Sequence, residues 1–159
     1  TATFGENLIL SYGSSNVYFD KVKLKNKNLE LSTVKKAVAD YLMTLPQIRR
    51  VYTEEEILHN AGSDYYLNAI ARGYDVTQNG DLVFQFKPGI IEYGKTGTTH
   101  GSTFTYDTHV PLLFYGWKIK KGESHDKKVI TQIAPTLAQK LKISLPNGTE
   151  AEVLSEILP

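Results

Sequence analysis

The sequence predicts an α/β fold. Three patterns indicate this class. Short apolar runs that alternate with polar residues are typical of half-buried strands, and longer stretches with apolar residues every three to four positions are typical of amphipathic helices. One continuous apolar run, followed by a helix pattern, is typical of a strand buried on both faces. The chain has 159 residues, enough for a domain with its own core.

The first part of the chain predicts two strands joined by a turn. Residues Asn7–Tyr12 form an apolar run that ends at the turn-forming sequence Gly13–Asn16. Val17–Lys25 then alternates, with Val22 and Leu24 on one side and lysines on the other, which predicts a half-exposed strand at a sheet edge. We interpret the lysines as its solvated face, and phosphate or nucleic-acid binding is the alternative.

A helix and a third strand are expected next. From Ser32, a possible N-cap, to about Leu45, apolar residues follow the i, i+3, i+4, i+7 pattern, and Pro46 ends the helix. The apolar segment Ile48–Tyr52 predicts a strand.

Two further helices are marked by capping signals. Thr53 and Glu56 form a capping box, which predicts a short helix. Another helix is expected to start at Ser63 or Asp64 and to end at Gly73, with its leucine, isoleucine and alanine residues on one side.

The remaining segments include one long loop. Asp81–Lys87 alternates as a strand does, whereas Lys87–Tyr106 is rich in glycine and threonine and predicts a functional or mobile loop. Val110–Gly116 is the continuous apolar run and predicts a buried strand. An amphipathic helix is expected from about Thr131, with Pro135 in or just before its first turn, where proline is tolerated.

Composition excludes several classes of protein. Eighteen basic and 17 acidic side chains give a net charge of +1, which argues against a nucleic-acid partner held by phosphate neutralisation. With no cysteine, the chain has no disulfide, no cysteine-ligated metal and no cysteine nucleophile. No apolar run approaches the roughly 18 residues of a membrane span.

The segment Gly89–Thr96 matches the phosphate-binding motif G-x-x-x-x-G-K-[ST]. A functional motif of this kind leads directly into a helix whose N-terminus faces the phosphate. The residues after Thr96, Gly97–Ser102, are glycine, threonine, histidine and serine, which are a poor start for a helix. A nucleotide-binding protein is therefore only a minor alternative.

Two histidines and an aspartate lie close together before the apolar run. His100, Asp107 and His109 are residue types that bind zinc, and the glycine-rich surroundings of His100 allow its ring to be aimed. From spacing alone, a metal site and ordinary structural hydrogen bonding both remain open. His59 and His125 lie in polar surroundings and are interpreted as surface residues.

A catalytic triad of Ser102, His109 and Asp107 is disfavoured. All three residues come from one short stretch, so no independent element would orient the base.

Three segments resemble the C-terminal end of the alkaline phosphatase superfamily. They are T-H-G-S at Thr99–Ser102, Y-D-T-H-V-P-L-L-F-Y-G at Tyr106–Gly116, and I-T-Q-I-A-P-T-L at Ile130–Leu137. The sequence is especially similar to the monomeric, phosphate-irrepressible bacterial type, which is akin to nucleotide pyrophosphatase/phosphodiesterases. The resemblance is specific over residues 94–149 and looser over 1–93.

The resemblance implies a three-layer mixed sheet with flanking helices and a small α+β cap region. It further implies that residues 1–159 are a C-terminal fragment of one catalytic domain, and therefore an incomplete domain. In this division residues 1–93 are the cap or insert-like α+β region. Residues 94–159 hold the metal-ligand loop, a core strand and the C-terminal helix.

The function implied by the resemblance is hydrolysis of small-molecule phosphate esters by a zinc-dependent phosphomonoesterase with a Thr or Ser phospho-enzyme. The T-H-G-S context places one zinc ligand at His100 rather than His109. Asp107 and His109 would then be orienting or structural neighbours. The remaining ligands of the two zinc ions and the nucleophile would lie upstream of Thr1, so no catalytic residue is expected in this chain, which should be inactive alone.

Two other functions remain open. One is a phosphodiesterase or nucleotide pyrophosphatase of the same superfamily, and the other is a non-catalytic module of this fold that binds sugar or protein. The resemblance also implies a periplasmic or secreted protein that is a monomer at full length.

Overall fold

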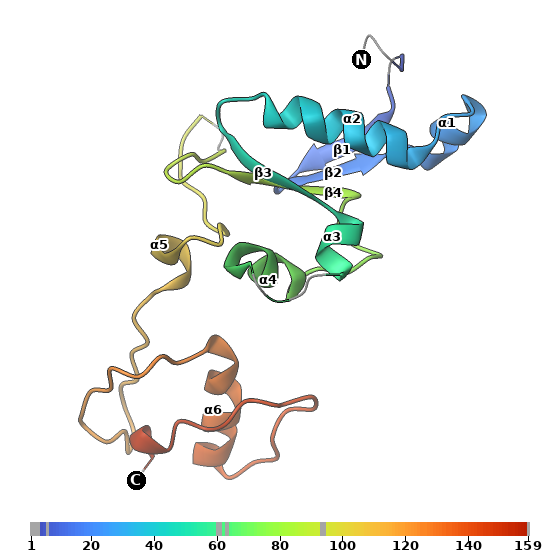
Figure 1. Cartoon of the computed structure of the whole chain (residues 1–159). Coiled ribbons are helices and arrows are strands. Elements are labelled where there is room, and N and C mark those ends of the chain that lie inside the picture. The colour runs from blue at the N-terminus through green and yellow to red at the C-terminus, as the bar shows by residue number, and fades with distance from the viewer. Residues whose placement is uncertain (1–3, 6, 60–61, 63, 93–94, 159) are drawn as a thin grey trace. The chain divides into compact units, whose positions relative to one another are not determined.

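The computed structural model describes residues 4–5, 7–59, 62, 64–92 and 95–158. The chain divides into two units, residues 1–109 and 110–159. The first unit contains a sheet with helices, and the second is built around one helix (Figure 1).

The first unit is a four-stranded antiparallel sheet with helices, in the strand order β1-β2-β4-β3. Its elements in chain order are β1 (Ile9–Gly13), β2 (Asn16–Phe19), α1 (Lys21–Asn26), α2 (Leu31–Met43), β3 (Ile48–Thr53), α3 (Glu54–Leu58), α4 (Tyr65–Ala71), β4 (Leu82–Phe86) and α5 (Thr105–Thr108). The predicted α/β class is confirmed.

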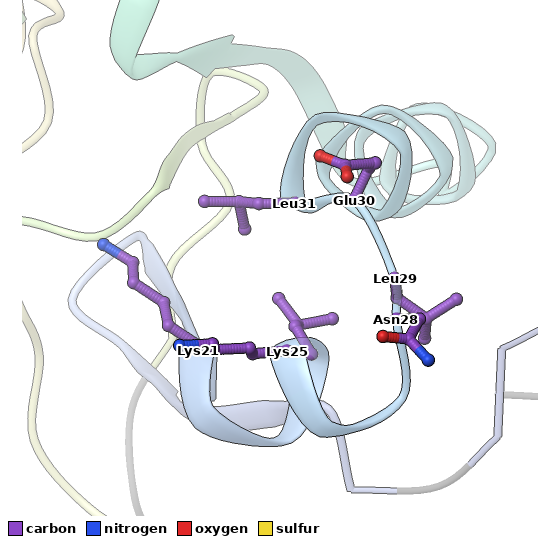
Figure 2. A pocket seen from close by; sticks show the side chains of 7 residues that line it. Lys21, Lys25, Asn28, Leu29, Glu30 and Leu31 are labelled. Atoms are coloured by element: carbon purple, nitrogen blue, oxygen red, sulfur yellow. The ribbon is translucent and has the colours of Figure 1, made fainter.

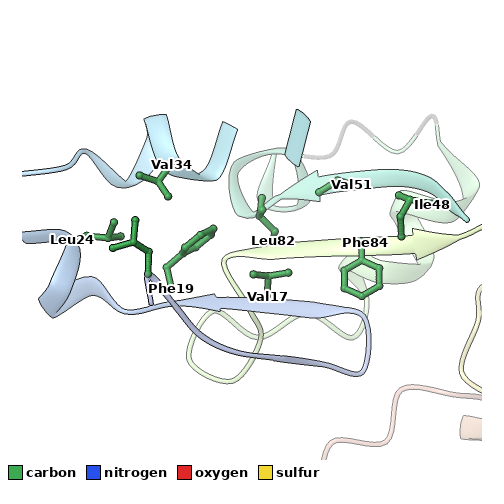
Figure 3. Close-up of a cluster of buried hydrophobic side chains, with 9 residues drawn as sticks. Val17, Phe19, Leu24, Val34, Ile48, Val51, Leu82 and Phe84 are labelled. Atoms are coloured by element: carbon green, nitrogen blue, oxygen red, sulfur yellow. The ribbon is translucent and has the colours of Figure 1, made fainter. Parts of the chain in front are cut away.

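The main core lies between one face of this sheet and helices α1 and α2. Figure 3 shows residues of β2, β3 and β4 gathered in one cluster with Leu24 of α1 and Val34 of α2. The buried members of this core are Leu8, Val17, Phe19, Leu24, Val34, Ile48, Val51, Leu82 and Phe84. The alternation predicted for β4 is confirmed, because Leu82, Phe84 and Phe86 all contact this core.

A smaller core covers the opposite face of the sheet. It consists of Tyr52 and Val83 from the strands, Ile57 from α3 and Leu67 from α4. Since side chains alternate along a strand, Gln85 of β4 belongs to the same face as Val83.

Strand β3 contains a bulge at Arg49. Ile48 pairs with Phe86 and Arg50 pairs with Gln85, so Arg49 is one extra residue with no partner of its own. The bulge explains why Ile48 and Val51, three residues apart, are both buried in the main core.

Local capping determines where two of the helices begin. Thr53 and Glu56 form the predicted capping box at the start of α3. The Asp64 side chain accepts hydrogen bonds from the backbone N–H groups of Tyr66 and Leu67, which makes Asp64 the N-cap of α4. The cap at Thr53 is the predicted one; of the two starts predicted for α4 the structure shows Asp64, and Ser63 lies outside the described residues.

The strand predicted for Val17–Lys25 at a sheet edge is wrong beyond Phe19, and β2 itself lies inside the sheet, between β1 and β4. Helix α1 begins at Lys21, because the Asp20 carboxylate accepts a hydrogen bond from Lys23 N–H at 2.9 Å and caps the first turn. Leu24 is buried, whereas Val22 is 70% exposed, so the two residues do not share a face as they would in a strand.

The buried strand predicted for Val110–Gly116 is also wrong for this chain. These residues form neither helix nor strand, and Leu113 is 87% exposed. A strand requires a neighbouring strand to satisfy its backbone groups, and within the described residues none pairs with this segment.

The second unit contains α6 (Ile133–Leu141) and two 3₁₀ turns, Ile130–Gln132 and Ser155–Ile157. Pro135 lies buried in the first turn of α6, as expected. The buried Thr136 hydroxyl donates to Gln132 O at 2.6 Å and accepts from Leu154 N–H at 2.9 Å. These bonds tie the last residues of the unit to the helix.

The apolar side predicted for α6 is only partly buried. Ala138 is buried, but Leu137 and Leu141 are exposed in this unit. In the parts of the chain that the structure describes, no helix is both long enough and apolar enough to cross a membrane.

Candidate functional site

The three predicted site residues lie in or next to one loop of the first unit. As expected, the described residues between Phe86 and Thr105 form neither helix nor strand. His100 lies in this loop with an exposed side chain, and His109 is exposed where it follows α5. Asp107 is half-buried, and its Oδ2 accepts a hydrogen bond from Ser102 N–H at 2.9 Å. This hydrogen bond joins the loop at Ser102 to α5 at Asp107, five residues further along the chain.

Aromatic packing attaches the loop to the body of the unit. Phe104 is buried and packs edge-on against Tyr66 of α4, with ring centroids 5.4 Å apart. Tyr106 stacks on Phe104 at 5.5 Å, and its hydroxyl accepts a hydrogen bond from Gly89 N–H at 3.2 Å. The end of the loop is therefore fixed to both α4 and the segment after β4.

A buried amide connects the sheet to the same loop. Gln85 of β4 is 7% exposed; its Oε1 accepts a hydrogen bond from Arg49 Nη1 at 2.6 Å, and its Nε2 donates one to Thr103 Oγ1 at 2.6 Å. The Arg49 guanidinium lies over the Tyr66 ring, 4.2 Å from the centroid.

Gln85, Arg49 and Thr103 are not among the site residues predicted from the sequence. The available signal was the polar Gln85 on a strand whose other residues are apolar, because a polar residue at such a position needs a partner. Nothing in the sequence indicated which residue that partner is.

The described residues do not form a complete metal site. Among them, no three side chains of His, Asp or Glu lie close enough together to hold a metal ion. The His100 ring takes part in no hydrogen bond or ion pair within the described part of the chain. The loop therefore offers one exposed imidazole as a ligand, and the remaining ligands of any zinc site would have to come from elsewhere.

The alternative motifs gain no support. Tyr93 and Gly94 of the Gly89–Thr96 motif lie outside the described residues, and the described residues after it form no helix before α5. The Ser102 hydroxyl accepts a hydrogen bond from Phe104 N–H at 3.4 Å and has no histidine partner among the described residues. His59 and His125 are exposed, as expected for surface residues.

Two cavities of the first unit lie outside this loop. One, of about 400 Å³, lies where Lys21 and Lys25 of α1 face Glu30 and Leu31 at the start of α2 (Figure 2). The other, of about 480 Å³, is lined by Tyr74 and Asp81 among others. Burial and the nearby carboxylates of Glu54 and Asp81 raise the pKa of Tyr74 to about 12. Neither cavity is lined by a predicted site residue.

Comparison with known proteins gives a consistent result. The chain is 35% identical over 154 residues to alkaline phosphatase PafA of Elizabethkingia meningoseptica, a match that covers 96% of this chain and 28% of the relative. The crystal structure of wild-type PafA matches with a TM-score of 0.86 over 97% of this chain and 30% of that chain. The chain is homologous to part of a PafA-type alkaline phosphatase. The resemblance read from the sequence is thereby confirmed.

A second relative is a protein of Myroides odoratus named as a calcium-transporting ATPase. It is 29% identical over 154 residues, which cover 96% of this chain and 28% of the relative. The chain thus spans less than a third of the length of both relatives. No model of a protein family matches the chain.

Proposed function

We propose that this chain contributes to a zinc-dependent phosphomonoesterase of the alkaline phosphatase type, which hydrolyses small-molecule phosphate esters. The supporting observation is the combination of 35% identity and a TM-score of 0.86 to PafA over nearly the whole chain. Since the chain spans only about 30% of the PafA structure, the activity belongs to a larger protein in this proposal.

The residue of this chain that we assign to the zinc site is His100. Its ring is exposed and takes part in no hydrogen bond or ion pair among the described residues, so it is available to a metal. Its loop is fixed on both sides, by Gly89 and Tyr106 and by the contacts of Phe104. The Asp107 carboxylate supports the loop by accepting the hydrogen bond from Ser102 N–H. His109, which directly follows α5, is an exposed neighbour of the site and not a ligand in this proposal.

The other ligands and the nucleophile lie outside this chain in our proposal. The nucleophile is a Thr or Ser of the upstream part, and the isolated chain is inactive. The PafA-type relative favours a phosphomonoesterase over a phosphodiesterase or a non-catalytic module.

Hydrolysis of p-nitrophenyl phosphate tests whether the chain is inactive alone. We expect no zinc-dependent hydrolysis by the 159-residue chain. Hydrolysis that is lost in His100→Ala and kept in His125→Ala would show that the chain holds a working site. His125 is a suitable control because it is exposed and pairs only with Glu123.

Zinc affinity of the larger enzyme tests the assignment of His100. We expect His100→Ala to weaken zinc binding strongly, because one imidazole ligand is removed, and His125→Ala to leave the affinity unchanged. If His109→Ala weakens zinc binding and His100→Ala does not, the ligand is His109 and the assignment is wrong.

We also infer a monomeric protein in the periplasm or outside the cell, with no nucleic-acid partner. The near-balanced charge of the chain supports the last point, and the family resemblance supports the others. Sedimentation of the larger enzyme at several concentrations tests the monomer, since a concentration-dependent increase in mass would contradict it.

A further inference from the structure

Both ends of the Gln85 amide are engaged between the sheet and the His100 loop. The carbonyl oxygen accepts a hydrogen bond from Arg49, and the amide nitrogen donates one to the Thr103 hydroxyl, each at 2.6 Å. Rotating the amide by half a turn would place its N–H groups against the guanidinium, which carries only donors. The buried amide is therefore held in one orientation.

The contacts around Gln85 form a closed ring. Arg49 projects from the bulge of β3 and lies over the Tyr66 ring, and Tyr66 in turn packs against Phe104. Phe104 is the residue next to Thr103, which Gln85 holds. This closed set of contacts holds two consecutive loop residues. Thr103 is held by Gln85 of β4, and Phe104 is held by Tyr66 of α4.

His100 lies just before the fixed part of the loop. Ser102 N–H is held by the Asp107 carboxylate, and Thr103 is held by Gln85. Gly101, between His100 and Ser102, has a φ of +104°, a conformation that other residues rarely adopt. Ser102 and Thr103 are therefore anchored residues that follow His100 at a distance of two and three positions.

The burial of Phe104 also attaches the loop, through an apolar contact. A buried polar pair adds little net stability compared with apolar side chains of similar volume, because its groups must be desolvated. The directed bonds of Gln85 do, however, select one loop conformation among those that an apolar contact would permit.

We propose that Gln85 and Thr103 are positioning residues for His100, acting through the hydrogen bond that joins the sheet to the loop. Arg49 orients the Gln85 amide for this role. The inference rests on the proposed role of His100 as a zinc ligand.

Amide hydrogen exchange of the 159-residue chain, measured in the absence of zinc, tests the hydrogen bond between Gln85 and Thr103. In Thr103→Val, which removes the hydroxyl, we expect the Ser102 and Gly89 amides to exchange about 5- to 10-fold faster, the effect of losing one hydrogen bond. Thr103→Ser keeps the hydroxyl and should keep the protection. The Phe84 amide, which bonds to Ser15 O, is the internal reference. Unchanged exchange at Ser102 and Gly89 in Thr103→Val would overturn the proposal.

Zinc affinity of the larger enzyme, measured by competition with a chelator, tests the consequence for His100. We expect Thr103→Val and Gln85→Met to weaken zinc binding about 10-fold. Thr103→Ser keeps the hydroxyl and should bind zinc as tightly as the unchanged enzyme. Val34→Ala is the matched control, because it destabilises the main core on the other face of the sheet without touching the loop. Its zinc affinity should stay unchanged.

The outcomes separate the two proposals. If His100→Ala leaves zinc affinity unchanged, the assignment of His100 fails. If His100→Ala weakens zinc binding but Thr103→Val and Gln85→Met do not, the positioning role is wrong and the assignment of His100 stands. An equal loss of affinity in Val34→Ala would show a general effect of stability and would also overturn the positioning role.

Discussion

The ammonium of Lys35 on α2 lies 2.7 and 2.9 Å from the two carboxylate oxygens of Glu55 on α3. The Lys35 side chain is 5% exposed, whereas that of Glu55 is 63% exposed. A buried ammonium is stable only with a partner, so the carboxylate at the surface compensates the charge inside. The pair links the helix over the main core to the helix over the smaller core.

Removing the carboxylate should destabilise the first unit. We expect Glu55→Ala to lower the free energy of unfolding by about 1–2 kcal/mol, because a hydrogen-bonded charge loses its partner at a partly solvated site. Lys35→Met, which removes the buried charge itself, should cost less. Urea unfolding of both variants provides the measurement. A larger loss in Lys35→Met than in Glu55→Ala would contradict this account.

The same pair should make stability depend on pH in the acid range. The hydrogen bond from Lys35 holds the pKa of the Glu55 carboxyl below its usual value of 4.5. Because the pKa is lower in the folded state, the stabilisation is complete above about pH 5 and disappears as the pH falls through the folded-state pKa. The stability difference between the unchanged chain and Glu55→Gln should therefore shrink as the pH is lowered from 6 to about 3. Asp40→Asn, in the exposed pair with Lys36, is the control. A constant difference for Glu55→Gln would refute the prediction.

Gly80 is required by the close approach of two backbone segments. A Cβ at this position would lie 2.6 Å from Val17 O and 2.9 Å from Val17 N, both backbone atoms of β2. We expect Gly80→Ala to destabilise the chain by about 1–3 kcal/mol through overpacking. Gly122→Ala meets open space and should change stability by less than about 0.5 kcal/mol. Thermal unfolding distinguishes the two, and equal midpoints would argue against a clash.

Leu113 tests whether the apolar run after the loop becomes a strand in the larger enzyme. In the 159-residue chain its side chain is 87% exposed, so Leu113→Ala should change stability by less than about 0.5 kcal/mol. Leu82→Ala, in the main core, should cost about 2–5 kcal/mol. In the larger enzyme, we expect Leu113→Ala to approach the cost of Leu82→Ala, because the resemblance to alkaline phosphatases predicts a core strand there. An effect that stays small in the larger enzyme would exclude a buried strand.

Features governed by neighbouring residues could be predicted from the sequence. The capping box of Thr53 and Glu56, the N-cap Asp64 and the position of Pro135 each depend on interactions within one helical turn. The candidate loop was recognised from its composition, and His100 from a short motif within it. The hydrogen bond between Ser102 and Asp107, five residues apart, was not recognised.

Features that depend on distant partners could not be predicted. The alternation at Lys21–Lys25 fits a strand as well as a helix, and only the Asp20 cap and the burial of Leu24 decide between them. Gln85 of β4 accepts a hydrogen bond from Arg49 on the neighbouring strand β3 and donates one to Thr103, which is 18 residues away in the sequence. Neither hydrogen bond leaves a pattern in the sequence. The apolar run at Val110–Gly116 indicates what a strand could bury, but not whether a partner strand is present.

The bulge at Arg49 affects how related sequences are compared. Arg49 is the extra residue, so Ile48 and Val51 share the main core although they are three positions apart. In a relative that lacks this residue the strand would be regular, and the residues equivalent to Ile48 and Val51 would be two positions apart and still on the same face. An alignment gap opened at Arg49 therefore keeps the two faces of the sheet matched, whereas a gap opened elsewhere in β3 would equate residues from opposite faces.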